Sequence, residues 1–448
     1  MNANDPASSR PTQPIATAKL DRALVNAQGD SVRYLMIDIV APQATPAAGA
    51  PKLPLDIALV LDASGSMAGQ RLDAAREAVR KLLLALAHED RVSLVSFADD
   101  VIVHASAVAA DAVGRAKVES EVDVLTTRGC TDLASGWLQG CECVAMRKSV
   151  AERHERDHVF LLSDGHANRG IVHPQQLAAH ADALRQRGVP SSTIGIGAGY
   201  SPIQLQAIAE AGGGRMHDAE NPEEIAEIVL AELGDTRNTV LQDVEVRLEL
   251  PAGVQAFAFG SARTTTRPGS IDTLLGSMLS GARRTLVVQL RTPAGQHGSS
   301  IEVRASLRWR HVETGEVAAV ALPPNEMTFA FAHECETQPR DVAASVIAAQ
   351  QWQAWVVHRA MQMNQEGAIQ EATDFVAQQL RHMSRYCRDL PGCGAYVEAL
   401  QRLLPTLHRR YDMPVAKEMM LSSYKRSRME EDRRSVKRYV AEEFLPGS

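Results

Sequence analysis

A short polar segment after an apolar run carries the side chains best suited to chemistry in this chain. Asp62, Ser64 and Ser66 stand at alternate positions directly after the apolar residues 55–61. One carboxylate and two hydroxyls supply small, hard oxygen ligands, which Mg²⁺ or Mn²⁺ prefers. The segment therefore predicts a divalent-cation site on a turn that leaves a buried strand. The alternative is that the serines cap a helix starting near Gly69.

The pattern Asp-x-Ser-x-Ser resembles the metal-ion-dependent adhesion site of von Willebrand factor type A (VWA) domains. The resemblance implies a threonine ligand on a second loop, offered by Thr131, and an aspartate at the end of a later strand, offered by Asp164. It also implies that the cation captures an Asp or Glu side chain of a partner protein in place of water. Mg²⁺ is the favoured ion, with Mn²⁺ or Ca²⁺ as alternatives. The implied metal ligands are Asp62, Ser64, Ser66, Thr131 and Asp164.

The loop around Thr131 departs from the pattern that many relatives show. They carry Gly-Gly-Thr followed by Asn, whereas this chain has Cys130 before the threonine and Asp132 after it. An extra acid near the ion would raise cation affinity and repel an acidic partner. We expect Cys130 to be a small packed residue. His166 is expected to be an ordinary loop residue, with a place at the metal rim or a role as a base as the alternatives.

Alternating strand and helix patterns must position these residues. From residue 55 to about 233, apolar strands alternate with amphipathic helices, which predicts a doubly wound, mostly parallel α/β sheet. In such sheets, ligands bind beyond the carboxyl ends of the strands, where the loops of Asp62, Thr131 and Asp164 would meet. The expected strands are 57–61, 91–97, 101–104, 158–163 and 192–197. The expected helices are 72–86, 109–122, one that follows the Thr131 loop, 175–187, 201–211 and 221–233.

In the rest of the chain, the spacing of apolar residues changes twice. Residues 240–332 alternate apolar and polar side chains, as antiparallel strands of a β-sandwich do, and we expect the upstream strand 32–40 to pair with it. From residue 341 the pattern is helical, and we expect the last helix to span 419–444. The Pro-Leu-Asp lead-in at 54–56 and the Glu-Asp-Arg-Val run at 89–92 resemble inter-α-inhibitor heavy chains and a group of bacterial proteins, which implies a similar organisation. The predicted division is a disordered segment 1–18, joining strands 19–50, a VWA domain 51–236, a β-sandwich 237–335 and a helical region 336–448.

Composition narrows the function classes. A net charge of -7 and a pI near 6.1 argue against nucleic-acid binding, and no apolar run reaches the ~20 residues that span a bilayer. The basic run 425–438 is interleaved with acids, as on a solvated helix face. We find no secretory signal and no disulfide or zinc spacing among the six cysteines. We therefore expect a cytoplasmic bacterial protein.

The sequence contains no recognisable catalytic constellation, such as a phosphate-binding loop, a nucleophile elbow or a His-Glu-x-x-His helix. We therefore expect a metal-dependent protein-binding module in a regulatory or assembly complex, with the helical region as a second docking element. The resemblance implies an AAA+ ATPase or a kinase and phosphatase system as partner. One alternative is a metal-dependent hydrolase with His166 or Asp132 as its base. Another is a surface or channel-associated adhesion protein.

Overall fold

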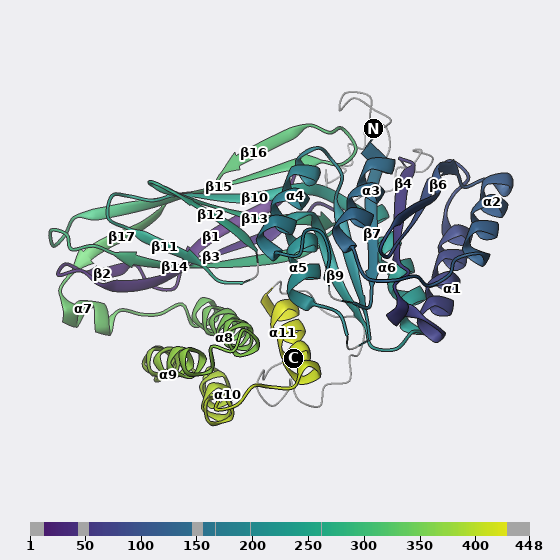
Figure 1. Ribbon diagram of the computed structural model, residues 1–448. Helices are drawn as coiled ribbons and strands as arrows, with labels where there is room; N and C mark the ends of the chain where they lie inside the picture. The colour runs from purple at the N-terminus through teal and green to yellow at the C-terminus, as the bar shows by residue number, and fades with distance from the viewer. Residues whose placement is uncertain are drawn as a thin grey trace, which may run out of the picture.

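Figure 1 shows three parts in this computed structural model: an α/β domain, a β-sandwich and a group of helices. The structure describes residues 13–43, 53–145, 156–165, 167–197, 199–260 and 262–427. Strand β1 (Ile15–Leu20) begins inside the segment 1–18, for which we expected disorder, so that expectation is wrong for residues 15–18. Residues 1–12 lie outside the described part.

A six-stranded sheet with the order β6-β5-β4-β7-β8-β9 forms the α/β domain. All neighbouring strands are parallel except β5 and β6, which confirms the predicted doubly wound, mostly parallel sheet. The sequence did not predict β9, which contains two glycines and three polar residues and lacks an apolar run. The strands are β4 (Leu55–Asp62), β5 (Arg91–Phe97), β6 (Val101–Ala109), β7 (Arg156–Ser163), β8 (Ser191–Ile196) and β9 (Gly213–Ala219).

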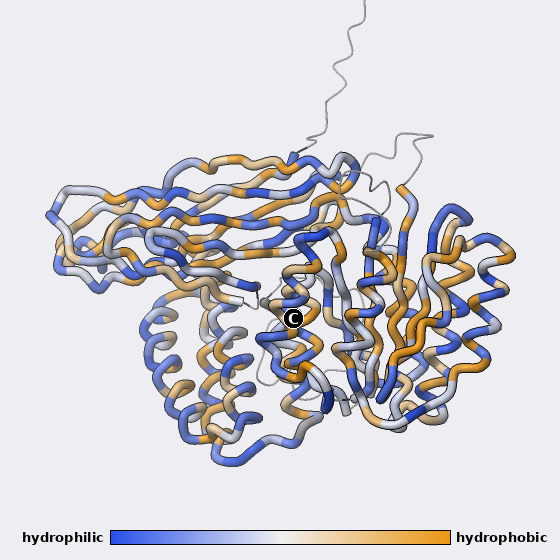
Figure 2. The backbone as a smooth tube through the Cα atoms, turned by 45° about the horizontal axis from the view of Figure 1, so that its top comes forward, coloured by the Kyte–Doolittle hydropathy of each residue, from blue (hydrophilic) through white to orange (hydrophobic). Residues whose placement is uncertain are grey.

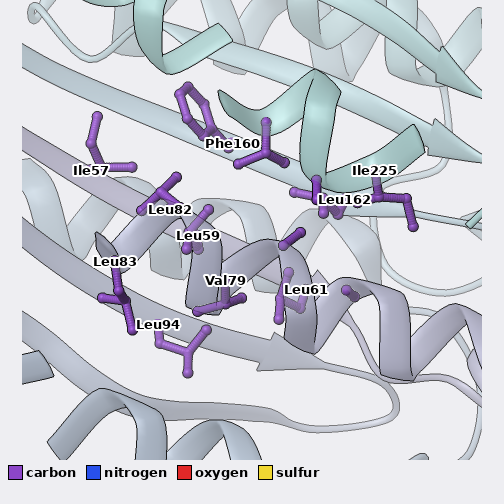
Figure 3. Close-up of a cluster of buried hydrophobic side chains, with 14 of the residues drawn as sticks. Ile57, Leu59, Leu61, Val79, Leu82, Leu83, Leu94, Phe160, Leu162 and Ile225 are labelled. Atoms are coloured by element: carbon purple, nitrogen blue, oxygen red, sulfur yellow. The ribbon is translucent and has the colours of Figure 1, made fainter. Parts of the chain in front are cut away.

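Helices cover both faces of this sheet. Alternate residues of β4 point to opposite sides: Ile57 and Leu59 pack toward α1 and α6, and Ala58 and Val60 pack toward α3. Figure 3 shows the first of these clusters, in which Leu82 of α1 meets β4. Burial on both faces explains why β4 reads as an unbroken apolar run. One face carries α1 (Gln70–Ala85), α2 (Ala112–Asp123) and α6 (Glu224–Asn238), and the other carries α3 (Leu133–Ala145), α4 (Pro174–Gln186) and α5 (Pro202–Ala211).

Two sheets, antiparallel except for the parallel pair β17 and β2, make up the sandwich, and their inner faces share one apolar core. Strand β3 (Ser31–Val40) pairs with β14 over its whole length, so the strand upstream of the α/β domain does join the sandwich. The α/β domain is therefore inserted between two sandwich strands. One sheet has the order β1-β3-β14-β11, with β11 (Gln255–Ala258) and β14 (Arg283–Thr292). The other has the order β12-β13-β10-β15-β17-β2, with β16 on β15, and comprises β2 (Leu24–Asn26), β10 (Thr239–Glu249), β12 (Arg263–Arg267), β13 (Ser270–Leu279), β15 (Ser300–His311), β16 (Val317–Ala321) and β17 (Asn325–Ala330).

The C-terminal helices pack under the sandwich and beside the α/β domain (Figures 1 and 2). Trp352 of α8 packs against Tyr34 and Phe259 of the sandwich, with ring centroids 5.8 Å and 6.2 Å away. The last described helix begins at Met413, six residues before the predicted start, and residues 428–448 lie outside the described part. The helices are α7 (Ala332–Thr337), α8 (Val342–Gln365), α9 (Ile369–Tyr386), α10 (Gly394–Leu403) and α11 (Met413–Ser427).

Helix α11 contacts both α8 and the α/β domain. Its Leu421 and Tyr424 are buried in the core formed by α3, α4 and α5. The inner face of α11 is therefore occupied by this chain itself. Across the described ranges, no helix combines the length and apolarity that a membrane crossing requires.

Candidate metal centre

Three loops meet at the carboxyl ends of β4 and β7. Asp62 is the last residue of β4, and Asp164 directly follows β7. The loop before α3 is tied to the first loop by two backbone bonds: Arg128 N donates to Ala63 O at 2.6 Å, and Gly65 N donates to Gly129 O at 3.2 Å. These bonds hold the loop that carries Thr131 beside the loop that carries the serines.

The predicted side chains contact one another at this junction. Ser66 Oγ donates to Asp164 Oδ1 at 2.6 Å and lies 3.0 Å from Ser64 Oγ. Ser64 N donates to Asp62 Oδ1 at 2.9 Å. A Cβ built on Gly165 would lie 3.2 Å from Thr131 Oγ1 and 3.7 Å from Asp62 Oδ2, so these two groups border the same glycine. The structure thus brings together all five residues that the resemblance implies.

The serines do not cap a helix. Ser64 precedes the short 3₁₀ helix η1 (Gly65–Met67), and its side chain makes no capping bond there. The residue before α1 is Gly69, at φ +80°, a conformation that favours glycine. The capping explanation for the two hydroxyls is therefore wrong.

Both carboxylates of the site are buried, and the ionised form of Asp62 is unfavourable there. Asp62 is fully buried and Asp164 is 1% exposed, whereas Ser66 is exposed. Burial raises the pKa of Asp62 above its usual value, against hydrogen bonds from Ser163 and Ser64, and the nearby Asp164 carboxylate adds to the rise. Two carboxylates and three hydroxyls form an all-oxygen donor set, so the residues present fit a hard divalent cation.

Three contacting residues escaped the sequence analysis. Ser163 Oγ donates to Asp62 Oδ2 at 2.5 Å and orients that carboxylate. Arg71 Nη1 donates to Asp164 Oδ2 at 2.5 Å and to the backbone oxygen of Ser66 at 3.1 Å. Asn168 Oδ1 accepts from Thr131 N at 3.2 Å. Ser163 stands beside a predicted ligand in the sequence, which was the one available signal; Arg71 and Asn168 carried none.

The residues around the rim have specific partners. Both carboxylate oxygens of Asp132 accept hydrogen bonds from Ser135, from its amide at 3.1 Å and from its hydroxyl at 2.8 Å. Asp132 therefore serves the start of α3. Cys130 is exposed, contrary to the packed position that we expected, and its amide donates to Asp99 at 3.0 Å. That bond and one from Arg169 lower the pKa of Asp99. His166 lies outside the described residues.

Comparisons with known proteins identify the α/β part of the chain. The family model for the von Willebrand factor type A domain matches residues 56–231. The uncharacterized protein YfbK of Escherichia coli (strain K12) is 25% identical over 205 residues, which cover 45% of this chain and 35% of YfbK. Inter-alpha-trypsin inhibitor heavy chain H3 of Homo sapiens is 28% identical over 172 residues, which cover 37% of this chain and 18% of the heavy chain. The aligned region thus spans well under two thirds of either relative.

Two solved structures share the fold over nearly the whole chain. A von Willebrand factor type A protein from Catenulispora acidiphila superposes with a TM-score of 0.67 at 17% identity and covers 94% of this chain and 99% of its own. The ArnB paralog VWA2 from Sulfolobus acidocaldarius gives a TM-score of 0.57 at 13% identity and covers 93% of this chain and 99% of its own. At these identities the similarity shows a common fold, which includes the sandwich and the helices.

Proposed function

Because residues 56–231 form a von Willebrand factor type A domain, we propose that this protein binds one divalent cation, Mg²⁺ by preference, at its metal centre. The cation then captures an Asp or Glu side chain of a partner protein. Such domains are commonly metal-dependent protein-interaction modules. The observation that supports the proposal is the convergence of three hydroxyls and two buried carboxylates from three separate segments.

The donor set explains why a captured ligand should be acidic. Mg²⁺ takes about six oxygen ligands in octahedral geometry. Hydroxyls such as Ser64, Ser66 and Thr131 are neutral, so only the two carboxylates offset the ion's charge, and Arg71 already pairs with one of them. Since Ser66 is exposed, the site opens to solvent on its side, where an outside carboxylate would replace water.

A binding role accounts for the site better than hydrolysis. A metal-dependent hydrolase needs a base beside the ion, and of the two candidates Asp132 has both oxygens engaged by Ser135, while His166 lies outside the described residues. We therefore propose a module that binds and does not cleave. A cytoplasmic bacterial setting, and a partner from an AAA+ ATPase or a kinase and phosphatase system, remain predictions from the resemblance.

Metal binding is tested on the full chain by titration with Mn²⁺, followed by the electron paramagnetic resonance signal of the free ion. We expect one ion per chain in the wild type and its loss in Asp62→Asn, which keeps the side-chain shape. Asp73→Asn is the matched control, because Asp73 is an exposed carboxylate on α1 that pairs with Arg76 and is not one of the proposed ligands. A wild type that binds no Mn²⁺ would refute the proposal.

Capture is tested by a pull-down from native lysate with wild type, Asp62→Asn and Asp73→Asn, each with Mg²⁺ or with EDTA. We expect proteins that wild type and Asp73→Asn retain only with Mg²⁺ and that Asp62→Asn does not retain. Retention of the same proteins in every condition would show that recognition does not use the metal centre.

A further inference from the structure

Arg71 places a positive charge directly on one of the proposed metal ligands. The side chain comes from the first turn of α1 and is 37% exposed. Its Nη1 bonds to Asp164 Oδ2 and to the backbone oxygen of Ser66. A Cβ built on Gly197, which follows β8, would lie 3.3 Å from Arg71 Nη2. The guanidinium therefore spans the loops that leave β4, β7 and β8.

The ion pair between Arg71 and Asp164 changes the net charge of the protein groups at the proposed metal centre. Asp62 and Asp164 bring two negative charges, the three hydroxyls bring none, and Arg71 brings one positive charge. The protein groups thus carry a single negative charge, and a divalent ion among them would leave one positive charge uncompensated. Without Arg71 the same ion would be neutralised by the two carboxylates alone.

The guanidinium of Arg71 also has N–H donors that make no hydrogen bond within the described residues. Among the described residues, nothing accepts a hydrogen bond from Arg71 Nε or Nη2, and the side chain reaches solvent. These N–H groups match the fork of a carboxylate. An acidic ligand at the ion would therefore meet a second cationic group beside it.

We infer that Arg71 is a specificity-determining residue, which weakens cation binding and strengthens the capture of a carboxylate by the bound cation. The second half of this inference rests on the proposed function. Arg71 holds Asp164 in competition with the ion, and it preserves the positive charge that an anionic ligand then neutralises. Loss of its charge should move the two affinities in opposite directions. A residue that only supports the fold of the site would weaken both when it is removed.

The experiment uses the full chain with Mn²⁺ as the cation and acetate as the carboxylate probe. Free Mn²⁺ is followed by electron paramagnetic resonance, and acetate binding is followed by the fall in water-proton relaxation as acetate displaces water from the bound ion. The variants are Arg71→Gln and the charge-preserving Arg71→Lys. Arg169→Gln is the matched control, because Arg169 is a rim arginine, 56% exposed, that pairs with Asp99 at 2.7 Å and touches no proposed ligand.

We expect Arg71→Gln to bind Mn²⁺ about fivefold more tightly and acetate less tightly by a similar factor, as expected for one partly exposed charge contact. Arg71→Lys should stay near the wild type, and Arg169→Gln should change either affinity less than about twofold, as its charge is more exposed and lies outside the ligand set. If Arg71→Gln weakens both affinities, or leaves Mn²⁺ affinity unchanged, the inference is overturned while the metal centre stands. If neither wild type nor Arg71→Gln binds Mn²⁺, both the proposed metal centre and the inference about Arg71 are refuted.

Discussion

Lys417 of α11 anchors the C-terminal helices to the α/β domain through one buried ammonium group. Its Nζ donates to the backbone oxygen of Gly197 at 2.5 Å and pairs with Asp218 Oδ1 at 2.8 Å. The ammonium also lies 4.1 Å from the ring centroid of Tyr200, whose hydroxyl donates to the same Asp218 oxygen at 2.7 Å. We predict that Lys417→Met destabilises the docking of α11.

The size of the effect follows from the burial of the pair. Removing one partner of a buried ion pair costs about 3–5 kcal/mol, because the other charge is left without compensation. The Lys417 side chain is 7% exposed, but Asp218 is 17% exposed and would keep the Tyr200 hydroxyl. We therefore expect a loss of about 2–3 kcal/mol for Lys417→Met and about 2 kcal/mol for Asp218→Asn. Since both variants break the same pair, the double variant should lose about 1–2 kcal/mol less than their sum.

Native-state hydrogen exchange of the α11 amides measures this opening free energy locally, whatever the stability of the other parts. Lys81→Met is the matched control: Lys81 is 48% exposed, lies 3.9 Å from Glu77, and should change stability by less than about 0.5 kcal/mol. Additive losses in the double variant, with coupling below about 0.5 kcal/mol, would refute the idea that the ion pair holds the helix.

Three further predictions concern acid, the metal ligands and the core. Burial lowers the pKa of His358 to about 4, whereas the unfolded side chain has a pKa near 6.5. Protons therefore bind the unfolded state more readily, so the free energy of unfolding is not reduced by this histidine above pH 6.5 and falls as the pH drops toward 4. Between pH 7 and pH 5 the wild type should lose about 2 kcal/mol of its free energy of unfolding through this residue, and His358→Gln should not. Urea titrations at both pH values measure the difference, and an equal pH dependence in the two proteins would contradict the prediction. Ser163→Ala deprives Asp62 of a donor at 2.5 Å, so Mn²⁺ affinity in calorimetric titration should fall about tenfold, and an unaltered affinity would be evidence against that role. Gly136→Ala would place a Cβ 2.4 Å from Phe97 Cβ, and a urea midpoint equal to that of wild type would disprove the expected loss of about 1–3 kcal/mol.

The elements that could be predicted best from the sequence are those in which burial alone determines the order of apolar and polar residues. Strand β4 is buried on both faces and reads as an apolar run, so its place in a parallel sheet could be predicted. Strand β9 contains Gly213, Gly214 and Asp218, which no strand pattern includes, and its pairing with β8 is set by tertiary contacts. The early start of α11 has the same kind of cause, because the first turns of that helix are held by packing on α8 and by the Lys417 contacts.

The candidate ligands could be predicted because their spacing is a local property, whereas the groups that orient them could not. Ser163 meets Asp62 because β4 and β7 are parallel neighbours in which Leu61 pairs with Leu162, and the next residues therefore stand side by side. That register requires the strand order, which residue spacing does not contain. The contact of Arg71 with Asp164 likewise depends on where the first turn of α1 lies relative to β7.

The side chains of Arg71 and Lys417 both lie against Gly197, and this residue connects the C-terminal helices to the candidate metal centre. The Gly197 backbone oxygen accepts from Lys417, and the Cβ side of the same glycine faces Arg71, which bonds to Asp164. At φ +67°, Gly197 occupies a conformation that other residues rarely adopt, so this close approach on both sides needs glycine. The position of α11 and the position of the Arg71 charge therefore depend on the same turn after β8. Its last described helix thus packs against the turn beside the candidate metal centre, and a role of the helical region as a second docking element stays a prediction.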